Sequence, residues 1–447
     1  MSPPPPEALS RSLKNRHIQM IALGGAIGTG LFYGSAASIR LVGPGIILSY
    51  LIGGLVIYLI MRMLGEMSTE EPVAGAFSYF AYRHWGGFAG FLSGWNYWLL
   101  YVLVSMAELS VVGIYVSYWL PDFPSWASAL IVLVAVTALN LLNVRSYGES
   151  EFWLAFIKIA AIIGMILLGV VLIIGGIDHK AAGLSNLWAH GGFLPNGVHG
   201  LLLSLVVVMF SFGGTELIGI TAGEADDPRR SIPRATNQVI WRILIFYVGA
   251  LAVLVILYPW NEIGMQGSPF VLIFSRLGIP AAPDILNLVV LSAAISVYNS
   301  GMYSNGRMLY SLAEQGNAPR MFLRLSSHHV PWVGILFSCA CTLAIVVINF
   351  LVPKGAFMQV MAVATAAAAL TWLMIVLVHL KFRRAHVGKQ LLFPSPWHPW
   401  TNYLCVAFLL GVVALMTQLD DTRLAAYVLP VWVGVLFAGY RLRGAPI

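Results

Sequence analysis

The chain has 447 residues, of which 59% are hydrophobic and only 10% are charged. Soluble domains carry about 25% charged residues, so this composition excludes a soluble protein and indicates an integral membrane protein. The net charge of +7 agrees with basic cytoplasmic loops, and no cluster of Lys, Arg and aromatic residues indicates a nucleic-acid partner.

Apolar stretches of about 20 residues, each long enough to cross a bilayer, follow one another along the chain. We therefore expect an all-α integral membrane fold with twelve transmembrane helices. They cover residues 18–42, 44–66, 87–119, 124–144, 150–176, 197–223, 236–259, 283–311, 332–352, 356–380, 401–419 and 424–442. Two connections are expected to be structured, namely 67–82 and, as a short amphipathic helix, 268–278.

The distribution of Lys and Arg predicts that both termini are cytoplasmic and that residues 1–17 form a cytoplasmic tail. With the N-terminus inside, the inner loops and tails hold most of the basic residues. The outer loops then hold only Lys180, Arg276, Lys354 and Arg423. An excess of basic residues marks the cytoplasmic side of a membrane protein.

The first expected span is interrupted between Gly24 and Gly30, where four of seven residues are glycines. Each interior Gly costs about 1 kcal/mol relative to Ala in a helix. Lipid cannot satisfy the freed backbone groups, so a helix broken at this depth has to line a cavity. The N–H groups that start the second half-helix could then bind a carboxylate. Alternatively, the glycines only let neighbouring helices approach closely.

The third expected span carries a polar and aromatic stripe that ends in a carboxylate. Its members are spaced by three or four residues, which places them on one helix face. They are Gly94, Trp98, Tyr101, Ser105 and Glu108. A matching stripe in the eighth span consists of Ser292, Ser296, Asn299 and Tyr303. These two faces are expected to look into the bundle and not toward lipid.

A second break is predicted in the sixth span. Residues 210–219 read Phe-Ser-Phe-Gly-Gly-Thr-Glu-Leu-Ile-Gly, so that a glycine pair and a carboxylate interrupt an apolar helix. Helices five positions apart in a serial bundle cross the membrane in opposite directions. The two breaks are therefore related as in an inverted repeat, which is typical of a transporter with its binding site near the midplane.

Three ionisable residues, Glu108, Lys158 and Glu216, fall deep inside expected spans. A charge at the bilayer centre costs about 2.5 to 3.5 kcal/mol on insertion scales, so these groups should face a cavity or a partner. One explanation is a structural ion pair of Lys158 with Glu108 or Glu216. The other is proton coupling, because a lysine that alternates between wet and dry surroundings can take up and release a proton.

Other functional classes have less support. The three cysteines, Cys339, Cys341 and Cys405, lie in apolar runs, which indicates buried thiols and neither a disulfide nor a metal site. No His-Glu-x-x-His motif, intramembrane Asp pair or nucleophile motif occurs, so we expect no enzymatic activity, cofactor or metal. A sensor or scaffold that binds an amino acid without moving it would need an output domain, and the tails are short. A passive channel has no need of a titrating lysine.

Several segments together resemble the bacterial amino acid transporter family of the amino acid/polyamine/organocation (APC) superfamily, and most closely its aromatic amino acid permeases. The segments are residues 16–32, 210–225, 231–235 and 296–301. The resemblance implies a LeuT-like fold with two inverted five-helix repeats, residues 18–176 and 177–380, followed by two extra helices in 381–447. It also implies proton-coupled symport of phenylalanine, tyrosine and tryptophan across the bacterial inner membrane by alternating access. Histidine, proline and 4-aminobutyrate, which related permeases carry, remain alternatives.

The resemblance also assigns a substrate site. The substrate carboxylate would bind the backbone N–H groups of Ala26, Ile27, Gly28, Thr29 and Gly30. The ammonium would bind backbone carbonyls of Ile21, Ala22, Leu23, Phe210 and Ser211. Phe210 would act as an inner gate, and Lys158 would stand where related sodium-coupled transporters hold a sodium ion. The expected partners are an amino acid, a proton and membrane lipid, and the protein is expected to be a monomer.

An aromatic substrate needs a wide apolar slot with ring contacts. The residues that could form it lie on the third, sixth and tenth expected spans. They are Gly94, Trp98, Tyr101, Phe210, Phe212, Gly214 and the alanine-rich run 362–369. For each aromatic residue, ordinary helix packing is the alternative.

Overall fold

We describe a computed structural model of the chain. The residues that the structure describes are 13–24, 27–73, 75–175, 183–263, 268–271, 281–351 and 356–443. Within these ranges the fold is helical throughout, apart from turns and one isolated bridge between Leu13 and Ala225. The expectation of an all-α protein is therefore confirmed.

Among the residues that the structure describes, eight helical segments are long and apolar enough to cross a membrane. They are Ser35–Glu70, Gly87–Ser117, Ser125–Leu142, Val144–Gly175, Pro228–Leu257, Ala282–Glu314, Phe357–Ala385 and Asp420–Leu442. Three shorter apolar helices accompany them, namely Gly197–Phe210, Trp332–Ile348 and Trp400–Met416. All of these segments overlap spans expected from the sequence.

The first expected span is broken, as predicted. Helix α1 (Asn15–Gly24) ends where the glycines begin, and the helix resumes as α2 (Thr29–Phe32) and α3 (Ser35–Val42). Gly28 precedes α2 in an extended conformation, with φ −133° and ψ −156°. The low helix propensity of glycine explains why the helix stops here.

The sixth expected span is broken as well. Helix α9 (Gly197–Phe210) ends at Phe210, and α10 (Leu217–Thr221) begins after a series of turns. Gly214 lies within these turns at a φ of 95°, a conformation that a residue with a side chain rarely adopts. The second break therefore depends on its glycine pair, as the first break depends on its own glycines.

Four long helices and the short α5 follow α3 in the part of the chain up to Gly175. They are α4 (Ile46–Glu70), α5 (Ala76–His84), α6 (Gly87–Ser117), α7 (Ser125–Leu142) and α8 (Val144–Gly175). The connection 67–82 is structured, as expected, because α4 runs on to Glu70 and α5 follows.

The helices after the second break continue the bundle. They are α11 (Pro228–Arg242), a π-helical stretch (Ile243–Gly249), α12 (Ala250–Leu257), α14 (Ala282–Glu314), α15 (Trp332–Thr342), α16 (Ala344–Leu351), α17 (Ala356–Ala385), α18 (Trp400–Met416) and α19 (Asp420–Leu442). Helix α11 begins earlier than the expected 236, because proline is well tolerated in the first turn of a helix. Of the amphipathic helix expected at 268–278, only 268–271 lie within the described residues.

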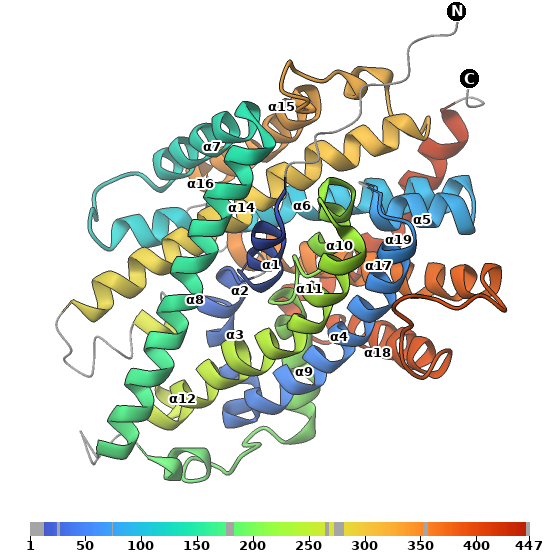
Figure 1. Ribbon diagram of the computed structural model, residues 1–447. Coiled ribbons are helices and arrows are strands. Elements are labelled where there is room, and N and C mark those ends of the chain that lie inside the picture. Colours follow the sequence, from blue (N-terminus) through green and yellow to red (C-terminus); the bar gives the residue numbers. More distant parts are fainter. Residues whose placement is uncertain are drawn as a thin grey trace, which may run out of the picture.

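Helices α6 and α14 form the centre of the bundle, where they pack against each other extensively. Helix α17 packs against α6, and α1 packs against α8, α10 and α11. Figure 1 shows α1 and α10 side by side in the middle of the molecule, so that the two interrupted spans meet in its interior.

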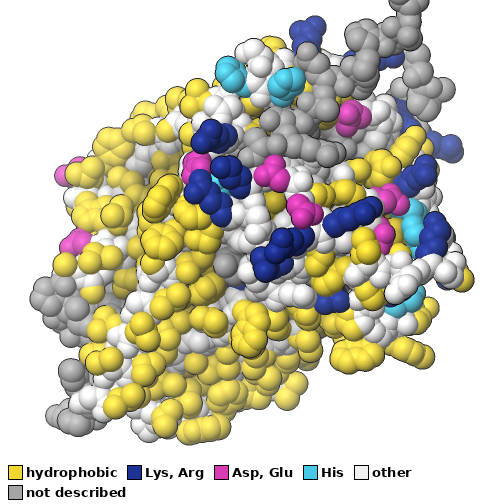
Figure 2. Space-filling model, viewed as in Figure 1, with side chains coloured by type: hydrophobic (Ala, Val, Ile, Leu, Met, Phe, Trp, Pro, Cys, Tyr) yellow, Lys and Arg dark blue, Asp and Glu magenta, His cyan; other side chains and the backbone are white. Residues whose placement is uncertain are grey.

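The outer surface separates apolar flanks from a charged end. The large apolar side chains on the outside of α8 are well exposed. They include Trp153, Phe156, Ile163, Leu167, Val171 and Ile174. In the view of Figure 2, Lys and Arg side chains gather over the upper part of the molecule, whereas the lower flank is largely hydrophobic. A surface divided in this way suits a protein that spans a bilayer.

Candidate functional site

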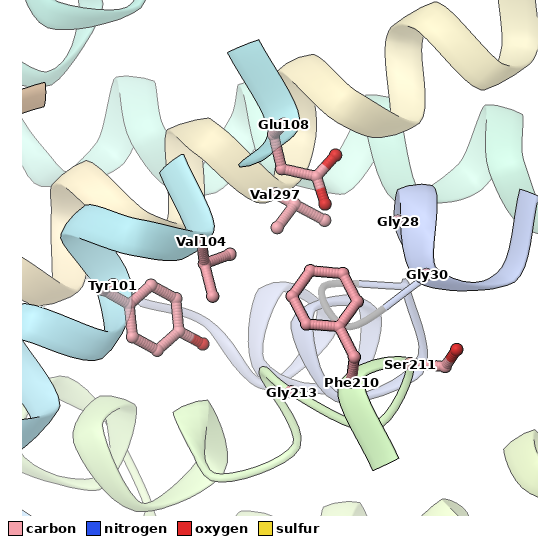
Figure 3. A pocket seen from close by; sticks show the side chains of 9 residues that line it. All are labelled: Gly28, Gly30, Tyr101, Val104, Glu108, Phe210, Ser211, Gly213 and Val297. Atoms are coloured by element: carbon pink, nitrogen blue, oxygen red, sulfur yellow. The ribbon is translucent and has the colours of Figure 1, made fainter. Parts of the chain in front are cut away.

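A small hollow lies where the two helix breaks meet, as Figure 3 shows. Its lining comes from the first break, α6, the second break and α14. The lining residues are Gly28, Gly30, Tyr101, Val104, Glu108, Phe210, Ser211, Gly213 and Val297. The ring of Phe210 points into the middle of this group and leaves a volume of only about 20 Å³. That is room for about one water molecule.

Two glycines of the first break allow the close approach. A Cβ at Gly30 would lie 2.8 Å from the Cα of Ser211 and 3.1 Å from Cδ1 of Phe210. A Cβ at Gly28 would lie 2.7 Å from Cγ2 of Val297 and 2.8 Å from Oε1 of Glu108. Such contacts are far tighter than side chains tolerate. Both interpretations of the glycine run therefore apply, since it breaks the helix and also brings the two breaks together.

The carboxylate of Glu108 binds at the start of α2. Its Oε1 accepts a hydrogen bond from the Thr29 hydroxyl at 2.9 Å and from the Thr29 backbone N–H at 3.3 Å. The side chain is only 2% exposed. Its Oε2 has no hydrogen-bond partner among the described residues. A carboxylate of the protein thus occupies the helix start that we expected to hold the carboxylate of a substrate.

Lys158 also binds the first break and is fully buried. Its Nζ donates to the carbonyl oxygen of Gly24 at 2.6 Å, to that of Ile27 at 3.1 Å, and to Oγ of Ser296 at 2.9 Å. The amine therefore satisfies carbonyls that the break has freed, which explains how an interrupted helix is tolerated at this depth. Within the described part of the chain Lys158 forms no ion pair, so the structural pairing with Glu108 or Glu216, one of the two explanations offered by the sequence, is not formed.

Glu216 stabilises the second break from within. Its oxygens accept hydrogen bonds from the backbone N–H of Gly214 at 3.2 Å and from the indole N–H of Trp372 at 3.3 Å. The carboxyl is fully buried but does not line the hollow. Glu216 therefore ties the break to α17, and it lies apart from Lys158 in the hydrogen-bond network.

Comparison with known proteins decides the family. The sequence model of the family described as "Amino acid permease" matches residues 17–444. The chain belongs to the amino acid permease family. The resemblance seen in the sequence is thereby confirmed.

The permease is similar to several named transport proteins over nearly its whole length. It is 53% identical over 436 residues to the "Aromatic amino acid transport protein AroP" of Escherichia coli O6:H1, covering 97% of this chain and 96% of that protein. The AroP protein of Salmonella typhimurium strain LT2 is also 53% identical, with 97% and 95% covered. The "Uncharacterized amino acid permease YtnA" of Bacillus subtilis is 49% identical over 443 residues, with 98% and 96% covered.

In the permease, two tyrosines from neighbouring helices hold the second break in place. Oγ of Ser211 shares a hydrogen bond of 2.8 Å with the Tyr50 hydroxyl, and the Ser211 carbonyl accepts one of 2.9 Å from the Tyr247 hydroxyl. The Phe212 ring packs between these two tyrosines, with centroids 5.7 Å and 5.3 Å away. Phe212 and Gly214 are therefore structural neighbours of the hollow, whereas Phe210 and Ser211 line it, with the Ser211 hydroxyl turned away from it.

Two residues expected from the stripe on α6 lie away from the hollow. The indole N–H of Trp98 donates to Oγ of Ser338 at 2.9 Å. A Cβ at Gly94 would meet Leu312 at 2.5 Å. The axial rise of a helix explains the difference, because Gly94 lies about 20 Å along α6 from Glu108, at the other end of the stripe. Sharing a helix face does not place two residues at the same depth.

The expected contacts on the first break are partly described. Ile21 is buried in α1, and the carbonyl of Ile27 is bound by Lys158. The side chains of Ala22 and Leu23 are not described, and Ala26 lies outside the described residues.

Three lining residues were missed from the sequence, namely Val104, Gly213 and Val297. Val104 lies between Tyr101 and Glu108 at helical spacing, so that the stripe on α6 could have revealed it. Val297 follows a residue of the stripe on α14 but is itself apolar. An apolar side chain in an apolar helix gives no indication of which surface it faces.

Proposed function

We propose that the permease takes up the aromatic L-amino acids phenylalanine, tyrosine and tryptophan together with a proton, by alternating access. The similarity to transport proteins named for aromatic amino acids supports the substrate class. The observation that carries the proposal is the meeting of two broken helices at a small hollow, with Glu108 and Lys158 both bound to the first break.

The proposed architecture is a twelve-span, LeuT-like bundle in the bacterial inner membrane. Residues 18–176 and 177–380 would form two inverted repeats, and residues 381–447 would add the last two spans. The breaks in α1–α2 and α9–α10 support this assignment, since they fall at equivalent places in the two repeats. Both termini would be cytoplasmic, in agreement with the distribution of Lys and Arg along the chain. We expect the permease to work as a monomer.

The substrate would use the backbone of both breaks. Its carboxylate would bind N–H groups of residues 26–30, near the Thr29 hydroxyl, and would compete there with Glu108. Its ammonium would bind carbonyls of residues 21–23 together with those of Phe210 and Ser211. Because the Phe210 ring now fills the hollow, it would have to swing away for the substrate ring to enter, as a gate does. Tyr101, Val104 and Val297 would then surround that ring.

Lys158 and Glu108 would couple uptake to the proton, while Glu216 would act indirectly through the second break. One proton moving down a potential of 100 mV supplies about 2.3 kcal/mol. At 1.4 kcal/mol per decade this supports roughly a 50-fold accumulation of solute. The amine of Lys158 is well placed for this task, because it binds both ends of the first break and so senses how the half-helices are arranged.

Uptake of radiolabelled phenylalanine into proteoliposomes tests the proposal, with an imposed proton gradient and a panel of unlabelled competitors. We expect tyrosine and tryptophan to compete, and we expect uptake to collapse when the gradient is dissipated. Competition by histidine, proline or 4-aminobutyrate, without competition by tyrosine or tryptophan, would contradict the aromatic assignment. Binding of phenylalanine without any uptake would instead indicate a sensor or scaffold.

A further inference from the structure

A second buried carboxyl lies close to Lys158 and has no role in the site described above. Glu151 is on α8, and its side chain is fully buried. Its Oε1 accepts a hydrogen bond from the Ser296 hydroxyl at 2.5 Å, and its Oε2 accepts one from the Asn299 amide at 3.2 Å. Both donors come from α14. Glu151 thus faces the interior of the bundle, where a carboxyl group is rare and usually functional.

One hydroxyl connects this carboxyl to the lysine. Ser296 Oγ accepts a hydrogen bond from Nζ of Lys158 at 2.9 Å and donates its own proton to Glu151. Glu151 and Lys158 are seven residues apart on the same buried face of α8, about 10 Å along its axis. The three groups therefore form a continuous row, lysine to serine to glutamate, with hydrogen-bond distances throughout.

We propose that Glu151 receives the proton that Lys158 releases during the transport cycle. In this step the ammonium of Lys158 gives a proton to Ser296 Oγ, while the Ser296 hydroxyl gives its proton to a carboxylate oxygen of Glu151. The products are a neutral amine, an unchanged serine and a protonated carboxyl. No other reactant is needed. This step rests on the proton-coupled function proposed above, and it adds the acceptor.

The position of Glu151 along α8 gives the proton transfer a direction. Helix α8 begins at Val144, so Glu151 lies between Lys158 and the helix end that packs near the N-terminal segment. One turn closer to that end, the Tyr147 ring stacks on Tyr303 with centroids 3.9 Å apart. The Tyr303 hydroxyl donates to Glu224. A proton that leaves Lys158 through Glu151 thus moves toward the proposed cytoplasmic side.

The other charged groups around the row do not replace Glu151. Glu108 and Arg242 also act electrostatically on Lys158, from α6 and α11. Glu108, however, is engaged by Thr29 at the first break. Glu224 is paired with Arg307, whose Nε lies 3.1 Å from the carboxylate. Among the described residues, Glu151 is the carboxyl that a single hydroxyl connects to the lysine.

The Glu151→Gln variant tests the step in proteoliposomes, because the amide keeps the size of the side chain but cannot take up the proton. We expect proton-driven accumulation of labelled phenylalanine to fall at least ten-fold. Exchange of internal unlabelled for external labelled phenylalanine should stay within about two-fold of wild type, because exchange does not require the proton to leave. Glu151→Asp should restore part of the accumulation. Glu149→Gln serves as a matched control, since Glu149 lies two residues away and pairs with Arg16 at the surface.

Three results would overturn the proposal. Normal accumulation by Glu151→Gln would show that the carboxyl is not needed. An equal loss of accumulation and exchange would show a purely structural role. Ser296→Ala leaves both titratable groups in place but removes the hydroxyl between them. Normal accumulation by this variant would show that the proton does not pass through Ser296. This test remains decisive if Glu151→Gln fails to fold. If wild-type protein showed no proton-driven uptake, the proposed function itself would fail, which is a different outcome.

Discussion

Lys158 illustrates how a single residue can stabilise a break and also report on it. Its amine donates three hydrogen bonds, two of them to carbonyls on either side of the first break. Any rearrangement of the half-helices changes these bonds, and with them the free energy of holding a proton on the amine. A lysine that only balanced charge would sit against a carboxylate, which Lys158 does not do among the described residues.

Replacing Lys158 by methionine should abolish uphill accumulation and leave binding measurable. Methionine fills a similar volume and cannot carry a proton. We expect concentrative uptake of phenylalanine in proteoliposomes to disappear, while equilibrium binding to the purified variant remains detectable. Lys381→Met, a surface change at the end of α17, should behave as wild type. Normal concentrative uptake by Lys158→Met would refute the coupling role.

Replacing Phe210 by alanine should weaken the apparent affinity for aromatic substrates severely, by ten-fold or more. The ring occupies the centre of the hollow and contacts Phe357 at a centroid distance of 6.2 Å. Without it, the bound substrate loses an aromatic contact and the gate that closes over it. The measurement is the concentration dependence of phenylalanine uptake, with Phe437→Ala on the outside of α19 as control. An unchanged affinity would remove Phe210 from the site.

At the level of helices, the breaks could be predicted because glycine acts through the backbone and needs no knowledge of neighbours. The contents of the hollow could be predicted only in part. Tyr101 and Phe210 stood out as aromatic residues near a polar group or a break. Val297 did not, because an apolar side chain looks the same whether it faces lipid, a helix or a cavity.

Helix ends were harder to predict than helix breaks. The apolar stretch predicts where a helix crosses the membrane, but α11 starts at Pro228, ahead of that stretch, in a segment rich in arginine. Charged residues in water can continue a helix without any apolar signal. The amino-acid composition likewise gave no indication of the π-helical stretch Ile243–Gly249.

The Gly30→Ala variant tests the close approach of the two breaks. Its methyl group would collide with the backbone of Ser211 at 2.8 Å, and backbone cannot move aside as a flexible side chain can. Overpacking of this kind typically costs about 1 to 3 kcal/mol. We expect a lower melting temperature and loss of phenylalanine binding. Gly411→Ala in α18, where a Cβ meets nothing within 4 Å, should leave both unchanged. Equal behaviour of the two variants would show that the breaks do not need this contact.

For the whole molecule, the division between a charged end and apolar flanks sets how it lies in the membrane. The basic residues suffice to predict the orientation of the chain, because the positive-inside bias depends on how Lys and Arg are shared among the loops. That the first and sixth spans lie side by side could be predicted only because their two breaks fit an inverted repeat. The polar stripes of the third and eighth spans indicated which faces of α6 and α14 look into the bundle, but they did not indicate that these two helices pack against each other.

The orientation predicts which exposed positions react with a membrane-impermeant maleimide. In a background without Cys339, Cys341 and Cys405, cysteine placed at Arg423 should be labelled on intact cells. Cysteine placed at Lys389 should be labelled only after permeabilisation. Both positions are exposed, so that accessibility depends on the side of the membrane. The opposite pattern would invert the proposed topology.

The central claim is that the backbone of the two breaks binds both charged ends of an amino acid. Isothermal titration calorimetry on the purified permease tests it by comparing phenylalanine with phenylalanine amide and N-acetylphenylalanine, which each lack one charged end. A hydrogen bond to a charged group contributes about 1.5 to 3 kcal/mol, so each derivative should bind roughly 10 to 100 times more weakly. Equal binding of phenylalanine and either derivative would contradict the account.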